Sequence, residues 1–178
     1  YTKLMALAFH DRKAIAQQSA IYSKNNSLDI FQLSGKKLSY NNYNDIYAAL
    51  NISKTLPKNT GTVIVKHANP CGVSVNKNKI ESYKEALSCD PISAFGGIVS
   101  CNFKVNKKIA LELSKIFLEV IIALGFDKVS LKILKKKKNL RLIDASKLKG
   151  DNLINITSNF DSLLLQNVDN KIFSKDNF

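Results

Sequence analysis

The stretch TVIVKHANPCGV, residues 62–73, decides the fold of this 178-residue chain. Its first four residues are β-branched throughout, which is typical of a strand buried on both faces of a sheet. Lys66 and His67 follow directly, where that strand ends. Open α/β folds bind ligands at the carboxyl ends of their strands, so we expect a functional site at this pair.

The elements around this stretch alternate between apolar strands and amphipathic helices. The pattern predicts strands at 28–33, 62–65, 97–101, 120–123 and 140–143, and helices at 44–54, 80–89, 106–117 and from 127 to the lysines at 135. Residues 1–22 are expected to be partly helical, and residues 66–73 to form a loop. Because the strands are apolar throughout, we predict an α/β domain whose sheet is covered on both faces.

The composition indicates a globular domain outside the membrane. Hydrophobic residues make up 45% of the chain, and no apolar run approaches the roughly 18–20 residues that span a bilayer. The start lacks an initiator Met and a clear signal peptide, so we interpret it as a truncation or a mature fragment. The three cysteines form no paired framework, which favours a reduced, cytoplasmic compartment.

The formal net charge of +13 raises the possibility of a nucleic-acid partner. Only Arg12 and Arg141 are arginines, however, and arginine is the usual residue for bidentate contacts to bases and phosphates. The lysine run at 135–138 falls at the end of a predicted helix, where cations favour the helix dipole. We therefore expect no nucleic-acid partner, and we keep a basic module for RNA or another polyanion as the alternative.

Lys66 and His67 have the chemistry for proton transfer. An imidazole can take a proton from an attacking amine, and a neighbouring ammonium can stabilise an oxyanion. Adjacent side chains of a strand point to opposite faces, so the pair needs a bend at Lys66–His67 to address one ligand. The alternative is a lysine in solvent and a histidine bonded to the loop backbone.

Zinc and thiol chemistry are both disfavoured at this loop. The order of His67, Pro70 and Cys71 is similar to the start of a zinc deaminase site, in which a glutamate shuttles the proton and a second cysteine follows three residues after the first. Here Asn69 replaces the glutamate and the second cysteine is missing, so we expect no metal. No acid or second histidine is placed by the sequence to activate Cys71 as a nucleophile.

Three further positions are candidates for ligand contacts. Phe95 can stack on a heterocycle, and the glycines that follow it let the backbone approach a ligand; the alternative is a turn with a core Phe. Glu119 directly precedes an apolar strand, so it is paired, faces a ligand, or sits at an edge open to water. Asn42 precedes a predicted helix, where the alternative role is capping.

Five blocks of the chain, taken in order, resemble one family. They are KKLSYNN at 36–42, VIVKHANPCGV at 63–73, CDPISAFGG at 89–97, EVIIALGF at 119–126 and KKKKNLRL at 135–142. Over residues 17–144 the order and spacing are similar to those of the bifunctional purine biosynthesis enzymes that join AICAR transformylase to IMP cyclohydrolase.

The resemblance implies a three-layer α/β/α fold, a cytidine-deaminase-like subdomain without zinc. It divides the chain into a divergent N-terminal segment at 1–24, the first transformylase subdomain at 25–145 and a connection toward a second subdomain at 146–178. That second subdomain would follow residue 178, and the cyclohydrolase domain would precede residue 1. We therefore expect the chain to be inactive alone.

The implied reaction is formyl transfer from 10-formyltetrahydrofolate to the 5-amino group of AICAR, giving FAICAR in de novo purine biosynthesis. His67 corresponds to the family's proton acceptor, and Lys66 to the lysine that assists the leaving folate or the oxyanion. The positions that contact AICAR correspond to Asn42, Phe95, Gly96 and Glu119. The implied partners are AICAR, a reduced folate and a second copy in a homodimer, without metal or membrane.

One segment departs from the family. Its members carry RYGENPHQ just before this domain, and the arginine and tyrosine help hold AICAR. Residues 10–17 of this chain read HDRKAIAQ, in which only Gln17 agrees. This departure motivates a third hypothesis, a non-functional gene remnant.

Overall fold

The computed structural model describes residues 2–7, 19–23, 28–148 and 154–167. The chain divides into two compact units, Tyr1–Leu148 and Lys149–Phe178.

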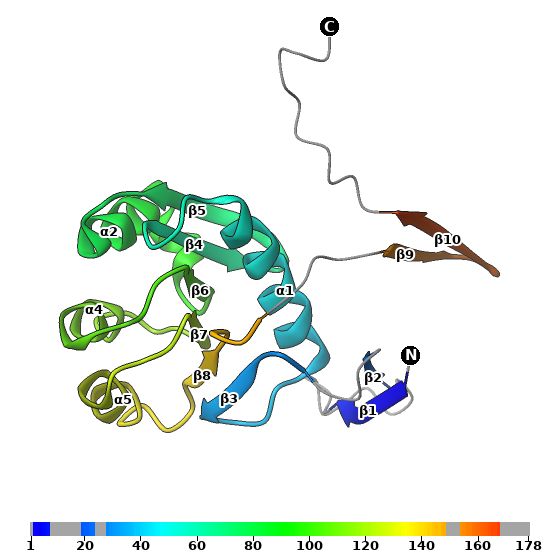
Figure 1. Ribbon diagram of the computed structural model, residues 1–178, viewed down its shortest axis with the longest axis horizontal. Helices are drawn as coiled ribbons and strands as arrows, with labels where there is room; N and C mark the ends of the chain where they lie inside the picture. Colours follow the sequence, from blue (N-terminus) through cyan, green and yellow to red (C-terminus); the bar gives the residue numbers. More distant parts are fainter. Residues whose placement is uncertain (1, 8–18, 24–27, 149–153, 168–178) are drawn as a thin grey trace, which may run out of the picture. The chain divides into compact units, whose positions relative to one another are not determined.

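A six-stranded mixed sheet forms the centre of the first unit (Figure 1). Its strand order is β3-β8-β7-β6-β4-β5, with β6, β7 and β8 parallel to one another. Strand β4 runs antiparallel to both β6 and β5, and β3 runs antiparallel to β8. The strands are β3 (Phe31–Ser34), β4 (Gly61–Lys66), β5 (Asn69–Val75), β6 (Ile98–Cys101), β7 (Val120–Ala123) and β8 (Arg141–Asp144).

Helices cover both faces of this sheet. Figure 1 shows α2, α4 and α5 along one side and α1 on the other, which confirms the predicted three-layer arrangement. The helices are α1 (Tyr40–Thr55), α2 (Lys79–Cys89), the short α3 (Pro91–Ala94), α4 (Lys107–Leu113) and α5 (Lys128–Leu134).

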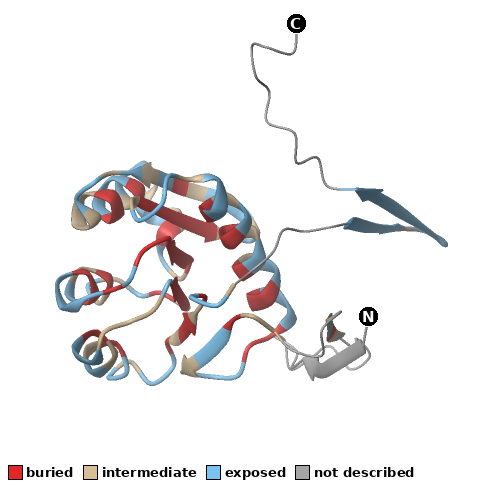
Figure 2. Ribbon diagram, viewed as in Figure 1, coloured by how far each residue is buried: buried red, intermediate tan, exposed pale blue. Residues whose placement is uncertain are grey.

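Two hydrophobic cores lie on opposite faces of the sheet because successive strand residues point to opposite sides. Val99 and Ile121 pack with α2, α4 and α5, whereas Val120 and Ile122 pack with α1. Figure 2 shows the buried positions concentrated in the strands and in the helix faces turned toward them. Fully burying one such aliphatic side chain contributes about 1.5–3 kcal/mol, so the two cores together fix the sheet.

Several element boundaries differ from the sequence prediction. Helix α1 begins at Tyr40 instead of residue 44, because Ser39 and Asn42 form a capping box that lengthens it. Helix α4 ends at Leu113 rather than 117. The loop predicted at 66–73 is wrong from residue 69 onward, because residues 69–75 pair with β4 and form strand β5.

The N-terminal prediction is also wrong where it can be compared. Residues 2–7 and 19–23 form the antiparallel strands β1 (Thr2–Leu7) and β2 (Ser19–Ser23) instead of helix, because they pair with each other. The altered segment at 10–17 lies outside the described residues.

The second unit contains an antiparallel hairpin of β9 (Ile154–Asn159) and β10 (Ser162–Asn167). Leu163, Leu164 and Leu165 lie in β10, and each is at least 60% exposed. Figure 2 shows this hairpin exposed on both strands. The predicted division of the chain into subdomains at 25–145 and 146–178 stays a prediction.

None of the helices described is long and apolar enough to cross a membrane.

Candidate functional site

A two-residue turn joins β4 to β5 and contains His67 and Ala68. Both have positive φ, 53° and 60°, and Lys66 pairs with Asn69 across the turn. Two positive φ values at the centre mark a type I′ hairpin, which bends the chain sharply. This is the bend that the sequence analysis required for Lys66 and His67 to address one ligand. Neither residue is glycine, so each costs about 1–3 kcal/mol of backbone strain.

Polar side chains hold this turn from two directions. The Ala68 N–H donates to Oδ1 of Asp45, on helix α1, at 2.7 Å. The Asn69 side-chain amide donates to the His67 carbonyl at 2.8 Å. A hydrogen bond to a charged acceptor contributes about 1.5–3 kcal/mol, so the Asp45 contact is of the size needed to offset the strain of one residue.

Lys66 is placed by the loop that follows α3. Its Nζ donates to the Phe95 carbonyl at 2.5 Å. Gly96 follows with a φ of 72°, and a Cβ at this position would lie 3.2 Å from that Nζ. Glycine therefore serves both the backbone conformation and the close approach of the lysine.

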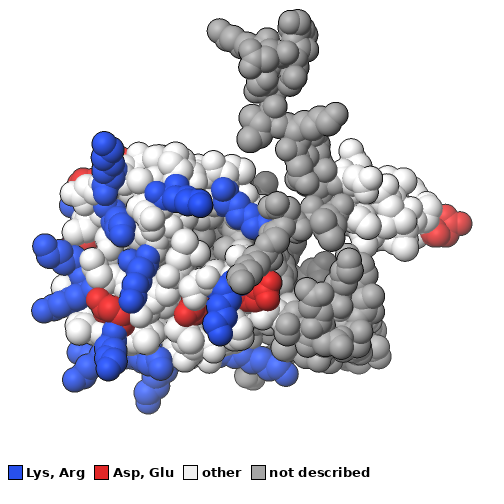
Figure 3. Space-filling model, in the orientation of Figure 1, with Lys and Arg blue, Asp and Glu red and all other residues white. Residues whose placement is uncertain are grey.

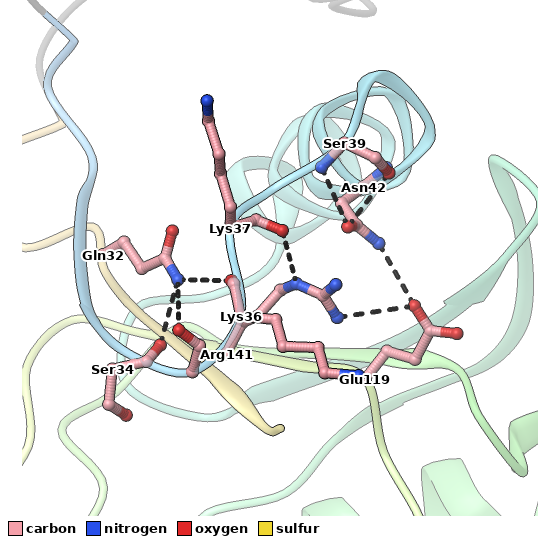
Figure 4. A network of polar contacts seen from close by, with 9 residues as sticks. Gln32, Ser34, Lys36, Lys37, Ser39, Asn42, Glu119 and Arg141 are labelled. Carbon is pink, nitrogen blue, oxygen red and sulfur yellow. Dashed lines mark hydrogen bonds and ion pairs between the residues drawn. The ribbon is translucent and has the colours of Figure 1, made fainter. Parts of the chain in front are cut away.

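Glu119 lies just before β7 and receives side chains from two other elements (Figure 4). The Asn42 side-chain amide, from α1, donates to Oε2 of Glu119 at 3.2 Å. Arg141, from β8, places its Nη1 3.7 Å from the same oxygen. A carboxylate beside an apolar strand is thus paired, and its other oxygen has no partner among these contacts.

Arg141 is anchored on a second side. Its Nε donates to the Lys37 carbonyl at 3.3 Å, and only 11% of its side chain is exposed. Burial lowers the pKa of Arg141, and the charge of Glu119 opposes that shift. Figure 4 also shows Gln32 donating to carbonyls of the 34–36 segment, which fixes the loop carrying Lys37.

These groups meet at one cavity of about 90 Å³. It brings together five of the six predicted site residues. Its lining consists of Asn41, Asn42, Asp45, Lys66, His67, Gly96, Ile98 and Glu119. A neighbouring cavity of about 190 Å³ shares Glu119 and adds Lys36 and Arg141.

Phe95 is the predicted residue that does not line the 90 Å³ cavity. Its ring is 60% exposed and packs on Phe117, with 5.4 Å between ring centroids. The expected alternative of a core Phe is wrong, because the ring projects outward from the loop. Only the Phe95 carbonyl reaches the site, through Lys66.

The position of the site on the sheet corrects one expectation. Lys66 lies at the carboxyl end of β4, as predicted, but β4 runs antiparallel to its neighbour β6. Gly96, Glu119 and Arg141 therefore meet it at the amino ends of the parallel strands β6, β7 and β8. The rule for parallel sheets does not apply here because the strand bearing the lysine is reversed.

The sequence analysis missed Asp45 and Arg141. Asp45 lies three residues after Asn42 on the same helix, which puts both on one face, and this spacing was a usable signal. Arg141 was detectable as one of two arginines among 27 cationic residues. Neither signal identifies the residue that is contacted, because Asp45 and Arg141 contact residues distant from them in sequence.

The other candidates at this loop have structural contacts. The Cys71 thiol contacts the Ile64 carbonyl at 3.6 Å, and burial, followed by the charge of Asp90, raises its pKa. A raised pKa disfavours the thiolate, which is the nucleophilic form. Across the part of the chain that the structure describes, no group of three or more His, Cys, Asp or Glu side chains is placed to hold a metal ion.

The basic side chains are dispersed on the face of the molecule seen in Figure 3. Figure 3 shows Lys and Arg side chains separated by neutral surface and by acidic residues on the face in view. In the run after α5, Lys135 caps the helix and Lys137 donates to the Ile116 carbonyl at 2.7 Å. At these two positions the run serves local structure, as expected for lysines at a helix end.

The fold and site define a three-layer α/β protein whose polar site lies at the amino edge of its parallel strands. The family model described as AICARFT/IMPCHase bienzyme matches residues 13–178. The chain therefore belongs to the AICARFT/IMPCHase bienzyme family.

Curated relatives agree with this assignment. The chain is 43% identical over 144 residues to the bifunctional purine biosynthesis protein PurH of Clostridium kluyveri, covering 81% of this chain and 28% of that protein. It is 40% identical over 163 residues to PurH of Petrotoga mobilis, covering 89% and 32%. It is 51% identical over 112 residues to PurH of Bacillus cytotoxicus, covering 63% and 22%. The chain thus spans less than a third of the length of these relatives.

Among solved structures, the chain is similar to Acinetobacter baumannii RibD, form 2, with a TM-score of 0.42 and 16% identity, covering 56% of this chain and 34% of that one.

Proposed function

We propose that the 90 Å³ cavity binds AICAR and supports transfer of a formyl group from 10-formyltetrahydrofolate to its 5-amino group. The observation that carries this proposal is the convergence of Asn42, Lys66, His67, Gly96 and Glu119, from separate elements, on one cavity. Family membership supports the same assignment.

The chemistry needs a proton acceptor beside a group that stabilises negative charge. As the amine attacks the formyl carbon, His67 takes the amine proton. Lys66 faces the oxygen that becomes an oxyanion, or the folate nitrogen that leaves. The carbon–nitrogen bond to the folate then breaks as the proton that His67 accepted passes to the leaving nitrogen, so FAICAR and tetrahydrofolate form. An ammonium has three donors, so the Phe95 carbonyl occupies only one of those on Lys66.

Glu119 suits the recognition of the acceptor. A carboxylate accepts hydrogen bonds only, and AICAR presents N–H groups on the reacting amine and on the carboxamide beside it. Asn42 and Arg141 both contact Oε2, so Oε1 is the oxygen that would accept from AICAR. Replacing that oxygen with an amide nitrogen would put two donors face to face.

Further parts of the proposal concern the whole enzyme. We propose that residues 25–145 form the first transformylase subdomain, that a reduced folate binds with residues from another subdomain, and that the enzyme acts as a homodimer. The isolated chain is then expected to bind AICAR without catalysing transfer.

A chimera tests the catalytic part. Residues 28–148 replace the matching segment of the Clostridium kluyveri relative, and formyl transfer to AICAR is followed with the chimera and its His67→Ala variant. Transfer by the chimera and its loss in the variant support the proposal. Transfer that survives in the variant would remove His67 from the proton-transfer role, and an inactive but folded chimera would contradict a working catalytic site in residues 28–148.

The polyanion hypothesis predicts a different result for the 178-residue chain. Binding to RNA that weakens steeply with salt, without saturable AICAR binding, would favour a basic module. Saturable AICAR binding that is lost in His67→Ala favours the enzyme.

A further inference from the structure

The turn that carries His67 is unusual in its residues. Two-residue type I′ turns favour Asn-Gly and similar pairs, because both positions need positive φ. Here His67 and Ala68 occupy them, with φ of 53° and 60°. Alanine has no side-chain group that stabilises a left-handed conformation, so an outside contact is needed to hold it there.

Asp45 supplies that contact. Ala68 lies inside the two-residue loop, so its N–H has no partner in the β4–β5 ladder. That N–H donates instead to the Asp45 carboxylate at 2.7 Å, a short distance typical of a charge-assisted hydrogen bond. Asp45 is half-buried and lines the same cavity as His67.

The helix that carries Asp45 also fixes the other side of the cavity. Asn42 stands three residues earlier on α1 and donates to Glu119 at 3.2 Å. Asn42 is itself 3% exposed and held in the capping box with Ser39. One face of α1 therefore sets the distance between the Lys66–His67 turn and Glu119.

We propose that Asp45 is a positioning residue: its carboxylate holds Ala68 in the left-handed conformation and so keeps Lys66 and His67 facing one cavity. The consequence for formyl transfer rests on the proposed function. The statement that Asp45 holds the turn does not depend on the proposed function.

The first measurement concerns the turn without any ligand. Amide hydrogen exchange at residue 68 and the three-bond HN–Hα coupling of His67 are compared in the 178-residue chain and its variants. Asp45→Ala should speed exchange by at least about tenfold, because the charged acceptor of that N–H is lost. Asp45→Asn keeps an acceptor oxygen without the charge, so its exchange rate at residue 68 should lie between those of the wild type and Asp45→Ala. Asn44→Ala, an exposed neighbour on α1, is the matched control and should resemble the wild type.

The second measurement uses AICAR affinity and a rescue. Asp45→Ala should weaken AICAR binding on the order of tenfold, because the turn loses its support. Adding Ala68→Gly should bring the affinity back to within about threefold of the wild type, since glycine adopts positive φ without strain. A loss that comes only from a damaged fold would not be rescued at residue 68.

Several results would overturn the inference. If amide exchange at residue 68 and the coupling of His67 are unchanged in Asp45→Ala, the turn keeps its conformation without Asp45. A failed rescue by Ala68→Gly in a folded double variant would show that Asp45 does not act on AICAR binding through the turn. If Asp45→Ala does not fold, Asp45→Asn and the double variant give the same comparison. If the wild type binds no AICAR, the proposed function fails, and the exchange data still decide whether Asp45 holds the turn.

Discussion

The cavities at the amino and carboxyl edges of the parallel strands differ in size and in the roles of their polar groups. The amino edge holds the 90 Å³ cavity with Lys66, His67 and Glu119. The carboxyl edge holds a cavity of about 320 Å³ whose lining combines leucines with polar side chains. The residues lining the larger cavity are Leu50, Ser53, Lys54, Leu56, Lys58, Asn102, Leu124, Ala145, Ser146 and Leu148.

Polar groups serve different purposes at the two edges. At the carboxyl edge, Asn102 accepts from the Gly61 N–H and donates to the Leu56 and Pro57 carbonyls, so its amide closes the loop before β4. At the amino edge, Lys66 and Glu119 keep atoms for further bonds. The proposed site is therefore at the smaller of these two cavities, where the direction of β4 brings Lys66 to the amino ends of the parallel strands.

The largest expected difference between the edges is catalytic. In the chimera, His67→Ala should slow formyl transfer about 10²–10⁴-fold, the usual contribution of a general base. Lys66→Ala should also lower the turnover number, since it removes the cation at the reacting centre. Lys58→Ala removes the same charge from the carboxyl edge and should leave turnover unchanged. Equal losses in both lysine variants would erase the distinction between the edges.

At the carboxyl edge we expect a substitution to lower stability and to leave AICAR binding unchanged. Asn102→Ala leaves the Gly61 N–H and two carbonyls without their partner and should lower the free energy of unfolding by about 2 kcal/mol. Urea unfolding followed by circular dichroism measures it, with the exposed Asn44→Ala as the control. AICAR affinity of the folded protein should not change; a selective loss of affinity with normal stability would place Asn102 in a binding site.

A smaller effect on binding is expected from Arg141→Lys. A lysine cannot bond the Lys37 carbonyl and Glu119 at once, so Glu119 loses part of its support and AICAR affinity should fall about threefold to tenfold. Calorimetric titration measures this change. In a Glu119→Gln background the same substitution should have little further effect, and an additive loss would mean that Arg141 does not act through Glu119.

The smallest expected effect concerns pH and the N-terminus of α5. The Ser130 N–H donates to Asp127 at 2.6 Å and lowers the pKa of that carboxyl. A lowered folded-state pKa means that the stabilisation is present above the unfolded value of about 3.9 and is lost as pH falls through the folded value. The stability gap between wild type and Asp127→Asn should therefore be widest near pH 7 and narrow below about pH 4. A gap that widens toward acid would contradict the sign of the shift.

Much of the fold was predictable because its strands are short apolar runs separated by amphipathic helices. Strand β5 was not, since Pro70 and Gly72 are typical of turns and its edge position exposes alternate residues. Its pairing with β4 decided the outcome. Gly72 is required there for another reason, because a Cβ would lie 1.9 Å from the Ala86 carbonyl of α2.

Five of the six predicted site residues line the 90 Å³ cavity, but their arrangement was only partly predictable. The need for a bend at Lys66–His67 followed from strand geometry alone, and the positive φ values meet it. The grouping of Asn42 with Glu119 was implied by resemblance and not by spacing, since 77 residues separate them. Asp45 was not predicted, because its helical spacing from Asn42 does not reveal the strained turn that it contacts.

The central claim is that AICAR binds at the amino edge of the parallel strands, and amide chemical shifts test it most directly. The ¹⁵N-labelled 178-residue chain is titrated with AICAR. We predict saturable shifts at Lys66, His67, Gly96 and Glu119, and none at the carboxyl-edge residues Asn102, Leu124 and Ser146. Shifts confined to the carboxyl edge, or no saturable shifts at all, would contradict the account.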